Sequence, residues 1–275
     1  MKALFVNGQF WDGEADRPVR GEVLLDGKHI EVVSDQPGSL PRQGAKLIDV
    51  SGATLIAGLV DAHSHLPFPQ NTTYFTQIED TPIEELVLTA VHNARVMIDH
   101  GFTGVIGAGS PRVRVELAVR SPAAIAFDGP YEARRAVRMC FREGVDVVKV
   151  NFSGDDLVRP AGRVTTLAPD EAAAIADAVR PLGLKLVAHA RACDSGYSAV
   201  AALRCATRYG YEAMGLGHER GLIHAGFIAD LLLVAGDPAQ DVKRLRHRDN
   251  LLCIVKEGKF HKQQAPEIGE AAQAA

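Results

Sequence analysis

The chain has 275 residues, 47% of them hydrophobic, which is enough for a large buried core in one domain or in one large and one small domain. Its net charge of -4 gives no electrostatic support for binding nucleic acid or an acidic membrane surface. No apolar stretch approaches the roughly 18 residues of a membrane helix, and the first residues turn polar too soon for a signal peptide. The four cysteines form no C-x-x-C pair. We therefore expect a cytoplasmic protein with reduced thiols.

The first 57 residues contain short extended segments separated by turn residues. Turn signals such as Asn7-Gly8 and Asp26-Gly27 stand between segments that are rich in branched and apolar side chains. The pattern predicts β-strands over residues 2–6, 21–25, 30–33 and 46–50.

Residues 58–202 alternate between strand and helix patterns. Residues 82–100 place apolar side chains at helical spacing until Gly101, and two further helical patterns follow. Nearly all-apolar strands that alternate with helices predict an α/β fold with a parallel sheet covered by helices. The expected helices are 82–100, 131–142 and 169–179, and the expected strands are 102–106, 145–150 and 184–188.

The last part of the chain begins with a helical pattern over residues 199–214 and then returns to strands at 228–234 and 252–256. Residues 263–275 have no periodicity, so we expect them to form a disordered tail.

Two histidines, His63 and His65, follow the apolar run 53–57. Residues two apart on a strand point to the same face, so the two imidazoles could hold one metal ion between them. A pair of solvated or capping histidines would produce the same spacing. Asp61 favours the metal interpretation, because a carboxylate commonly accepts a hydrogen bond from the second nitrogen of a metal-bound histidine.

Lys149 lies in the apolar strand 145–150, where a charged amine is costly to bury. It could pair with a carboxylate such as Asp146 or Asp155. Alternatively, its neutral amine could have added CO2 to form a carbamate, an anionic oxygen ligand that can bridge two metal ions. His189 ends the next apolar strand, 184–188, and a histidine in that place is either a satisfied core residue or a ligand.

These candidates share a position in the predicted fold. Each follows or ends a strand of the alternating region, and α/β barrel enzymes build their sites at the carboxyl ends of the strands. We interpret the remaining seven histidines as solvated or capping residues. The sequence contains no glycine-rich phosphate loop and no G-x-S-x-G nucleophile motif.

Taken together, the motifs resemble the metal-dependent amidohydrolase superfamily. The first of them is similar to its P-G-x-x-D-x-H-x-H signature, with Ala57 in place of the usual proline. The most similar branch is the imidazolonepropionase-like group, which includes prolidase-type peptidases and hydrolases of phenylureas and carbamates. The likeness is carried by residues 57–65, 147–150, 186–190, 221–234 and 250–259.

The resemblance implies an α/β fold with a (β/α)8, TIM-like barrel in residues 58–215. It also implies a small β-sandwich composed of residues 1–57 and 216–262. One or two divalent metal ions, zinc above all, would be bound by His63 and His65, by a carbamate on Lys149 and by His189. The ligands that would act in catalysis are Lys149 and His189.

The chemistry implied by the resemblance is hydrolysis of a C–N bond. Metal ions of this kind lower the pKa of bound water and polarise a carbonyl. Hydroxide would then attack an amide, urea or carbamate carbon, and an amine would leave. The partner would be a small molecule of that kind, such as an N-acyl amino acid or a dipeptide.

The chain departs from the family in length. The family barrel has a further histidine after the sixth strand and an aspartate after the eighth, but only the 13 residues 190–202 lie between His189 and Leu203 of the next helical pattern. A βα repeat with its next strand needs about 30 residues. Residues 58–202 number 145, whereas an eight-fold barrel has roughly 250. We therefore expect an incomplete barrel.

An open parallel sheet exposes unpaired backbone and core surface. A second chain could complete it, which predicts a homo-oligomer; otherwise the fold rearranges or the chain lacks segments of its parent. Without the aspartate, proton transfer could slow by on the order of 10²–10⁴, unless Asp155, Asp156 or Asp194 substitutes. The alternative function is an inactive or impaired scaffold that completes its barrel by self-association, and a weaker one is a simple metal-binding protein.

Overall fold

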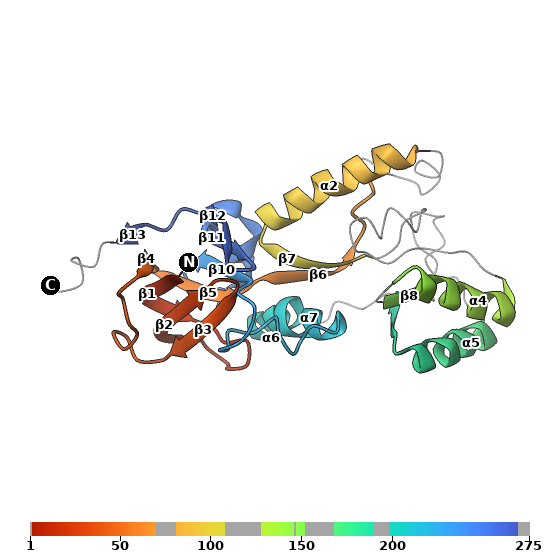
Figure 1. Ribbon diagram of the computed structural model, residues 1–275, viewed down its shortest axis with the longest axis horizontal. Helices are drawn as coiled ribbons and strands as arrows, with labels where there is room; N and C mark the ends of the chain where they lie inside the picture. Colours follow the sequence, from red (N-terminus) through yellow and green to blue (C-terminus); the bar gives the residue numbers. More distant parts are fainter. Residues whose placement is uncertain are drawn as a thin grey trace. The chain divides into compact units, whose positions relative to one another are not determined.

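The computed structural model describes residues 2–69, 81–107, 128–145, 147–151, 168–189 and 198–268 (Figure 1). These residues fall into two compact units. The first unit lies within Met1–Asp61, Val96–Gly104 and Gly196–Ala275. The second unit lies within Ala62–Arg95 and Val105–Ser195.

Strands and helices alternate in the middle of the chain, and strands dominate both ends. The strands are β1 (Lys2–Phe10), β2 (Val19–Asp26), β3 (His29–Ser34), β4 (Ala45–Asp49), β5 (Ala53–Ala57), β6 (Leu59–Ser64), β7 (Phe102–Gly107), β8 (Val147–Asn151), β9 (Lys185–His189), β10 (Leu231–Ala235), β11 (Leu251–Lys256), β12 (Lys259–Gln263) and β13 (Glu267–Ile268). The helices are α2 (Ile83–Asp99), α4 (Gly129–Arg142), α5 (Pro169–Val179), α6 (Ala199–Arg204) and α7 (Gly210–Ala213), with shorter turns η1 (Arg180–Leu182), η2 (Cys205–Tyr209), η3 (Val242–Arg246) and η4 (Arg248–Asn250).

A nine-stranded sheet of the first unit combines both ends of the chain (Figure 1). Its main path runs β12-β11-β10-β5-β1-β2-β3, and β4 pairs with β1 in parallel and with β13. The two ends meet where β10 pairs antiparallel with β5, from Leu231 opposite Ala57 to Ala235 opposite Ala53. The predicted strands at both ends of the chain are therefore confirmed, and they belong to one sheet.

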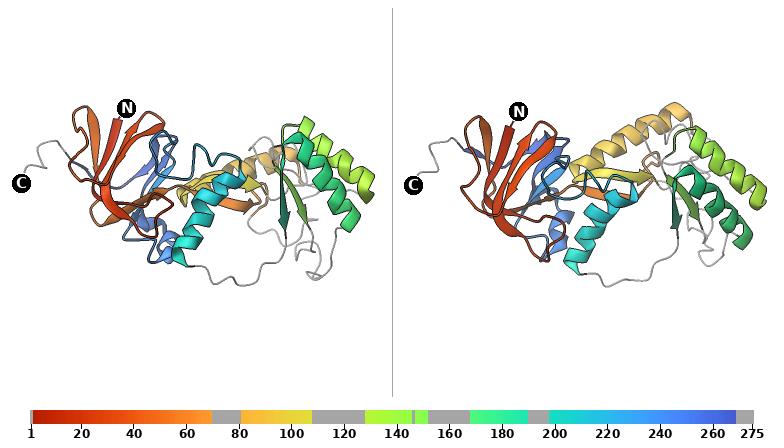
Figure 2. Two further views of the ribbon diagram at one scale, coloured as in Figure 1. Left: turned by 90° about the horizontal axis from the view of Figure 1, so that it is seen from below. Right: turned by 60° about the horizontal axis from the view of Figure 1, so that its bottom comes forward.

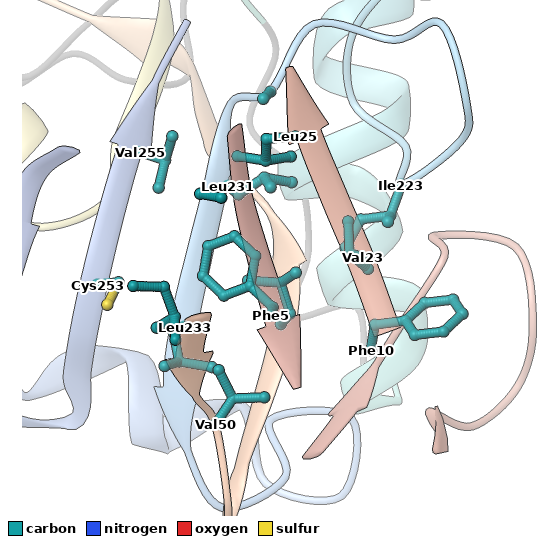
Figure 3. Close-up of a cluster of buried hydrophobic side chains, with 14 of the residues drawn as sticks. Phe5, Phe10, Val23, Leu25, Val50, Ile223, Leu231, Leu233, Cys253 and Val255 are labelled. Atoms are coloured by element: carbon teal, nitrogen blue, oxygen red, sulfur yellow. The ribbon is translucent and has the colours of Figure 1, made fainter. Parts of the chain in front are cut away.

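The core of this sheet is apolar on both faces of β10. Leu231 and Leu233 pack with Phe5, Val23 and Val255 (Figure 3). The alternate side chains of the strand pack into a different cluster, together with Trp11 and Leu203. Each fully buried side chain of this size stabilises the fold by about 1.5–3 kcal/mol. A short all-apolar strand thus becomes a central strand of the sheet.

The Asn7-Gly8 pair lies inside β1 and not in a turn between strands, which corrects the sequence-based expectation. The register of β1 against β2 shifts between Phe5 and Gly8, and Asn7 has a φ of 67°. A Cβ on Gly8 would lie 2.4 Å from the side chain of Val50. The pair therefore forms a bulge that lets β1 approach the end of β4, whereas Asp26-Gly27 forms the expected turn before β3.

The expectation of a disordered tail is wrong for residues 263–268. Gln263 is the last residue of β12, and Glu267 pairs with Ile48 of β4. A salt bridge joins Lys46 to Glu267 and adds to this pairing. These contacts depend on a partner some 220 residues away, so no local periodicity signals them. Residues 269–275 lie outside the described part.

In the second unit, α4 and α5 cover one face of the parallel pair β8–β9 (Figure 2). Val148 and Val150 of β8 pack with Val137 of α4 and Ile175 of α5. The backbone N–H of Gly129 donates to the carboxylate of Glu171, 2.7 Å away, which ties the start of α4 to α5. The predicted α/β alternation is confirmed for these elements.

The predicted helix 199–214 is confirmed over residues 199–213, and a π-helical turn interrupts its α-helical geometry. Cys205–Tyr209 forms a π-helical turn between α6 and α7. The hydroxyl of Thr207 donates to the carbonyl of Leu203, 2.8 Å away, and Gly210 lies against Val60. A Cβ on Gly210 would come within 2.6 Å of the Val60 Cβ, so the close approach to β6 requires glycine.

No helix among the described residues is long and apolar enough to cross a membrane. Cys140, Cys205 and Cys253 are free thiols, and Cys193 lies outside the described residues. The structure gives the three described cysteines no disulfide partner within its described part.

Candidate metal centre

The two predicted histidine ligands meet at the end of β6. His63 is the exposed penultimate residue of the strand, and half-buried His65 follows its last residue, Ser64. The Nε2 atoms of the two rings are 3.3 Å apart, and the ring planes are inclined by 63°. The i, i+2 spacing therefore brings the two imidazoles to one face, as the sequence predicts.

The separation of the Nε2 atoms suits a shared metal ion. Two nitrogens that are each about 2.05 Å from a tetrahedral zinc ion lie about 3.3 Å apart. The same distance allows one imidazole to donate a hydrogen bond to the other when no ion is bound. The pair supplies two ligands, whereas a zinc site with an open position has three protein ligands.

Asn93 of α2 anchors the segment that follows His65, and the sequence patterns did not single it out. Its side-chain amide donates to the carbonyls of Leu66 and Phe68, at 2.8 and 2.9 Å. The ring of Phe68 lies 4.7 Å from the ring of His65, centroid to centroid. A polar residue among the apolar positions of this helix was the available signal.

Lys149 and His189 lie on neighbouring strands of the second unit. In the parallel register of β8 and β9, Lys149 is opposite Val187 and Asn151 is opposite His189. Because Val148 and Val150 face the helices α4 and α5, backbone alternation places positions 149 and 151 on the other face of the pair. The side chains of Lys149 and His189 lie outside what the structure describes.

The histidine pair and the lysine–histidine pair belong to separate sheets. Among the described strands, β6 pairs with β7, and β8 pairs with β9. The described residues contain no group of three or more His, Cys, Asp or Glu side chains that could hold a metal ion. Convergence of the four predicted ligands therefore stays a prediction. The possible substitutes Asp155, Asp156 and Asp194, and the possible Lys149 partner Asp146, lie outside the described residues.

Asp230 is the centre of a buried ionic network in the first unit. Its side chain is fully buried and accepts hydrogen bonds from Arg220, from Lys256 at 2.8 Å and from the hydroxyl of Tyr211 at 2.9 Å. Its other oxygen accepts from the backbone N–H of Glu257. Both carboxylate oxygens of Asp230 therefore accept hydrogen bonds from groups of the fold itself, which indicates a structural role.

Tyr211 extends this network to β7. Because its single proton is donated to Asp230, the hydroxyl of Thr103 donates to the Tyr211 oxygen, 2.9 Å away. Burial and the neighbouring Asp230 carboxylate raise the pKa of Tyr211 far above its ordinary value. The phenol therefore stays neutral, and its hydrogen bond with Thr103 links α7 to the first residues of β7.

Several of the histidines taken as solvated or capping have partners in the first unit. The Nε2 of His261 lies 2.7 Å from Asp99, and that of His224 lies 3.5 Å from Glu14. The Nδ1 of His100 lies 2.8 Å from the carbonyl of Val96, which caps the end of α2. None of these contacts forms a larger cluster of metal-ligating side chains within the described residues.

The sequence model of the amidohydrolase family matches residues 54–198 and 191–260, which make up well over half of the chain. The chain belongs to the amidohydrolase family. The histidine pair at the end of β6, the strands β8 and β9 and the network around Asp230 all fall within the matched residues. The family predicted from the motifs is therefore confirmed.

A curated relative of this chain is the imidazolonepropionase of Treponema denticola, which is 43% identical over 53 residues. The matched segment is 18% of this chain and 13% of the relative, so it spans only a small part of the relative's length.

Two solved structures share its fold. One is an amidohydrolase with a TM-score of 0.84 and 19% identity, over 96% of this chain and 99% of that one. The other is a Xaa-Pro dipeptidase with bound methionine in its active site, with a TM-score of 0.81 and 18% identity, over 95% and 100% of the two chains. At these identities the likeness establishes the fold.

Proposed function

We propose that this amidohydrolase is a metal-dependent hydrolase that cleaves a C–N bond in a small amide, urea or carbamate, such as an N-acyl amino acid or a dipeptide. The observation that carries the proposal is the convergence of the His63 and His65 Nε2 atoms to 3.3 Å at the end of a strand. Membership of the amidohydrolase family supports the reaction class.

The residues present fit a divalent ion, zinc above all. His63 and His65 would hold the first ion, and Asn93 would keep the segment after His65 in place. Lys149 and His189 would complete the site. Their Cα positions are separated by one strand spacing and two residues along the strand, or about 8 Å, a span that a long lysine side chain can cover.

The chemistry of the site depends on both the ion and the chain. A divalent ion bound there lowers the pKa of a water molecule and polarises the scissile carbonyl. The exposed His63 and half-buried His65 provide neutral imidazole ligands beside solvent, so substrate and water can reach them. Asp61, half-buried two residues before His63, would accept a hydrogen bond from a ligand histidine and fix its orientation.

Lys149 would act as a ligand after modification. Its neutral amine adds to CO2 with formation of an N–C bond and release of one proton, which yields an anionic carbamate. The carbamate would supply oxygen ligands between two ions.

The substrate class is the least specific part of the proposal. The Xaa-Pro dipeptidase shares the fold of this chain, which supports an N-acyl amino acid or dipeptide. The purified chain, loaded with zinc, should release amine from N-acyl prolines, dipeptides or phenylureas, as measured by amine-specific detection.

The deciding test uses metal content and turnover together. His63→Ala should reduce bound zinc, measured by elemental mass spectrometry, and abolish turnover. His92→Ala is the matched control, because His92 is an exposed histidine of α2 in the same unit. Equal zinc content in both variants and the unmodified chain would overturn the proposal.

A second candidate function is a catalytically impaired scaffold that completes an incomplete barrel by self-association. The observation that favours it is the pairing of β8 and β9 as a two-stranded parallel sheet among the described strands, since so small a sheet is marginally stable by itself. On this proposal residues 58–215 form the barrel segment and residues 1–57 and 216–262 the β-sandwich. A monomeric mass by light scattering, together with turnover in zinc, would exclude it.

A further inference from the structure

A pocket of about 510 Å³ lies in the first unit, apart from the candidate metal centre. Its walls come from the start of β6 and β7, the end of α2, α6 and η3. This volume is in the range of pockets that hold small molecules in proteins, about 300–1,000 Å³. The apolar side chains that line it include Leu59, Val96, Met97, Phe102, Leu203 and Leu245.

The polar groups of the pocket are few. His100 lines it, and because the Val96 carbonyl can only accept, the Nδ1 of His100 carries the proton of their 2.8 Å contact. In the neutral ring Nε2 is then an acceptor. Arg246 also lines the pocket and is exposed, and its side chain makes no hydrogen bond or ion pair with any residue of the described part.

The charge around this edge is positive. Residues 241–249 contain four basic and two acidic side chains, in a chain with a net charge of -4. One of the basic residues, Arg248, is already paired with Asp99, at 3.3 Å. Arg246 is therefore the cation of this segment that is both in contact with the pocket and available to an incoming anion.

We propose that this pocket binds a small amphipathic carboxylate. The hydrocarbon body would lie against the apolar walls, and the carboxylate would pair with the Arg246 guanidinium at the edge. The Nε2 of His100 offers an acceptor for a hydroxyl or amide N–H on the same ligand. The wall formed by α6 runs into the π-helical turn η2 at Ala206, and π-helical turns frequently occur at functional sites.

The site is distinct from the proposed hydrolytic centre. The residues that line the pocket belong to the first unit, whereas His63 and His65 belong to the second unit. Because octanoate binding is measured without zinc and without turnover, its outcome does not depend on whether the chain hydrolyses anything.

Octanoate is the probe, measured by isothermal calorimetry with the full chain free of added zinc. Octanoate should bind more tightly than octanol or octylamine, because only octanoate matches the charge of Arg246. Shortening the chain to hexanoate should weaken binding by about tenfold, as expected for the loss of two buried methylene groups. Equal binding of octanoate and octylamine would overturn the proposal.

Two pairs of variants separate this pocket from general attraction to a basic surface. Arg246→Gln should weaken octanoate binding by about fivefold, the upper range for an exposed ion pair. Lys243→Gln removes the same charge from η3 outside the pocket and should change it less than twofold. Ala202→Met should narrow the pocket and weaken octanoate binding, while Ala201→Met on the same helix should leave binding unchanged.

The variants must retain the far-ultraviolet circular dichroism of the unmodified chain, and their mass is measured by light scattering. Equal effects of Arg246→Gln and Lys243→Gln would overturn the proposal. A change of oligomeric mass in Ala202→Met, without octanoate binding to the unmodified chain, would assign the pocket to a second copy and overturn it as well.

Discussion

The two units of the molecule differ in how their strands are stabilised. In the first unit, nine strands join into one sheet, β10 is apolar on both faces, and the buried Asp230 binds three cationic or hydroxyl groups. In the second unit, β8 and β9 form a two-stranded sheet that two helices cover on one face. All the proposed metal ligands belong to this second unit, which includes the last residues of β6.

This difference indicates a division between stability and chemistry. The first unit supplies its own core and satisfies its buried charges, whereas the second unit would gain stability from a ligand that joins its separate strands. The chain offers a direct probe for the comparison: Trp11, its one tryptophan, is fully buried in the first unit. Tryptophan fluorescence therefore follows the unfolding of that unit alone.

The largest expected effect is the loss of the Asp230 carboxylate. Asp230→Ala removes the acceptor that Arg220, Lys256 and Tyr211 share and should destabilise the first unit by about 3–5 kcal/mol. Urea titration followed by Trp11 fluorescence measures it. The exposed Asp249→Asn should change the free energy of unfolding by less than about 0.5 kcal/mol. Equal midpoints for both variants would show that the network does not stabilise this unit.

Zinc should act mainly on the second unit. At 100 times its dissociation constant, zinc should stabilise the unit that binds it by about 2.7 kcal/mol, measured by thermal unfolding at 222 nm. His63→Ala should remove this gain and His92→Ala should keep it. The proposed division between the units would be contradicted if, in every variant, zinc raised the unfolding temperature measured by Trp11 fluorescence as much as the one measured at 222 nm.

Acid should weaken the first unit through Glu22, a buried carboxylate of β2. Burial alone would raise the pKa of Glu22, but hydrogen bonds from Arg42 and from the backbone N–H groups of Gly38 and Leu40 lower it below its ordinary value. The stability it contributes is therefore present above the unfolded pKa of about 4.3 and is lost as pH falls through the lower folded value.

Glu22→Gln should accordingly lower the free energy of unfolding at pH 7 by about 1–3 kcal/mol and flatten its decline at acid pH. Urea titrations between pH 7 and pH 3, followed by Trp11 fluorescence, provide the comparison. An acid dependence that is as steep in the variant as in the unmodified chain would contradict the assignment.

The smallest expected effect concerns Asn93. Asn93→Ala removes both hydrogen bonds to the segment after His65 and should weaken zinc binding by about tenfold, the lower range for residues that orient metal ligands. Calorimetric zinc titration measures it, with the exposed Glu84→Ala of the same helix as control. Unchanged affinity would mean that Asn93 supports only the fold.

Local sequence patterns predicted the elements whose conformation depends on residues within the same segment. Apolar spacing located α2 and α5, and the i, i+2 rule placed the His63 and His65 rings together. The Asn7-Gly8 bulge was missed because it depends on the approach of Val50, and the tail pairing because it depends on Ile48. Both determinants lie far from the segment that they shape.

The site was predictable only in part for the same reason. The signature around residue 63 lies within a single segment, so its geometry follows from the sequence. Asn93, and the partners of Asp230, come from separate elements: Tyr211 from α7 and Lys256 from β11. Arg246 shows no pattern at all, because an exposed arginine becomes notable only when the structure places it beside an apolar pocket.

The pairing of β10 with β5 has a consequence for synthesis of the protein. Residues 53–57 of β5 leave the ribosome long before residues 231–235 of β10. One edge of β5 therefore has no pairing partner until β10 is synthesised. Such distant partners slow folding and leave apolar edges open to aggregation in the meantime. A nascent chain that stops before residue 231 should consequently need a chaperone to remain dispersed.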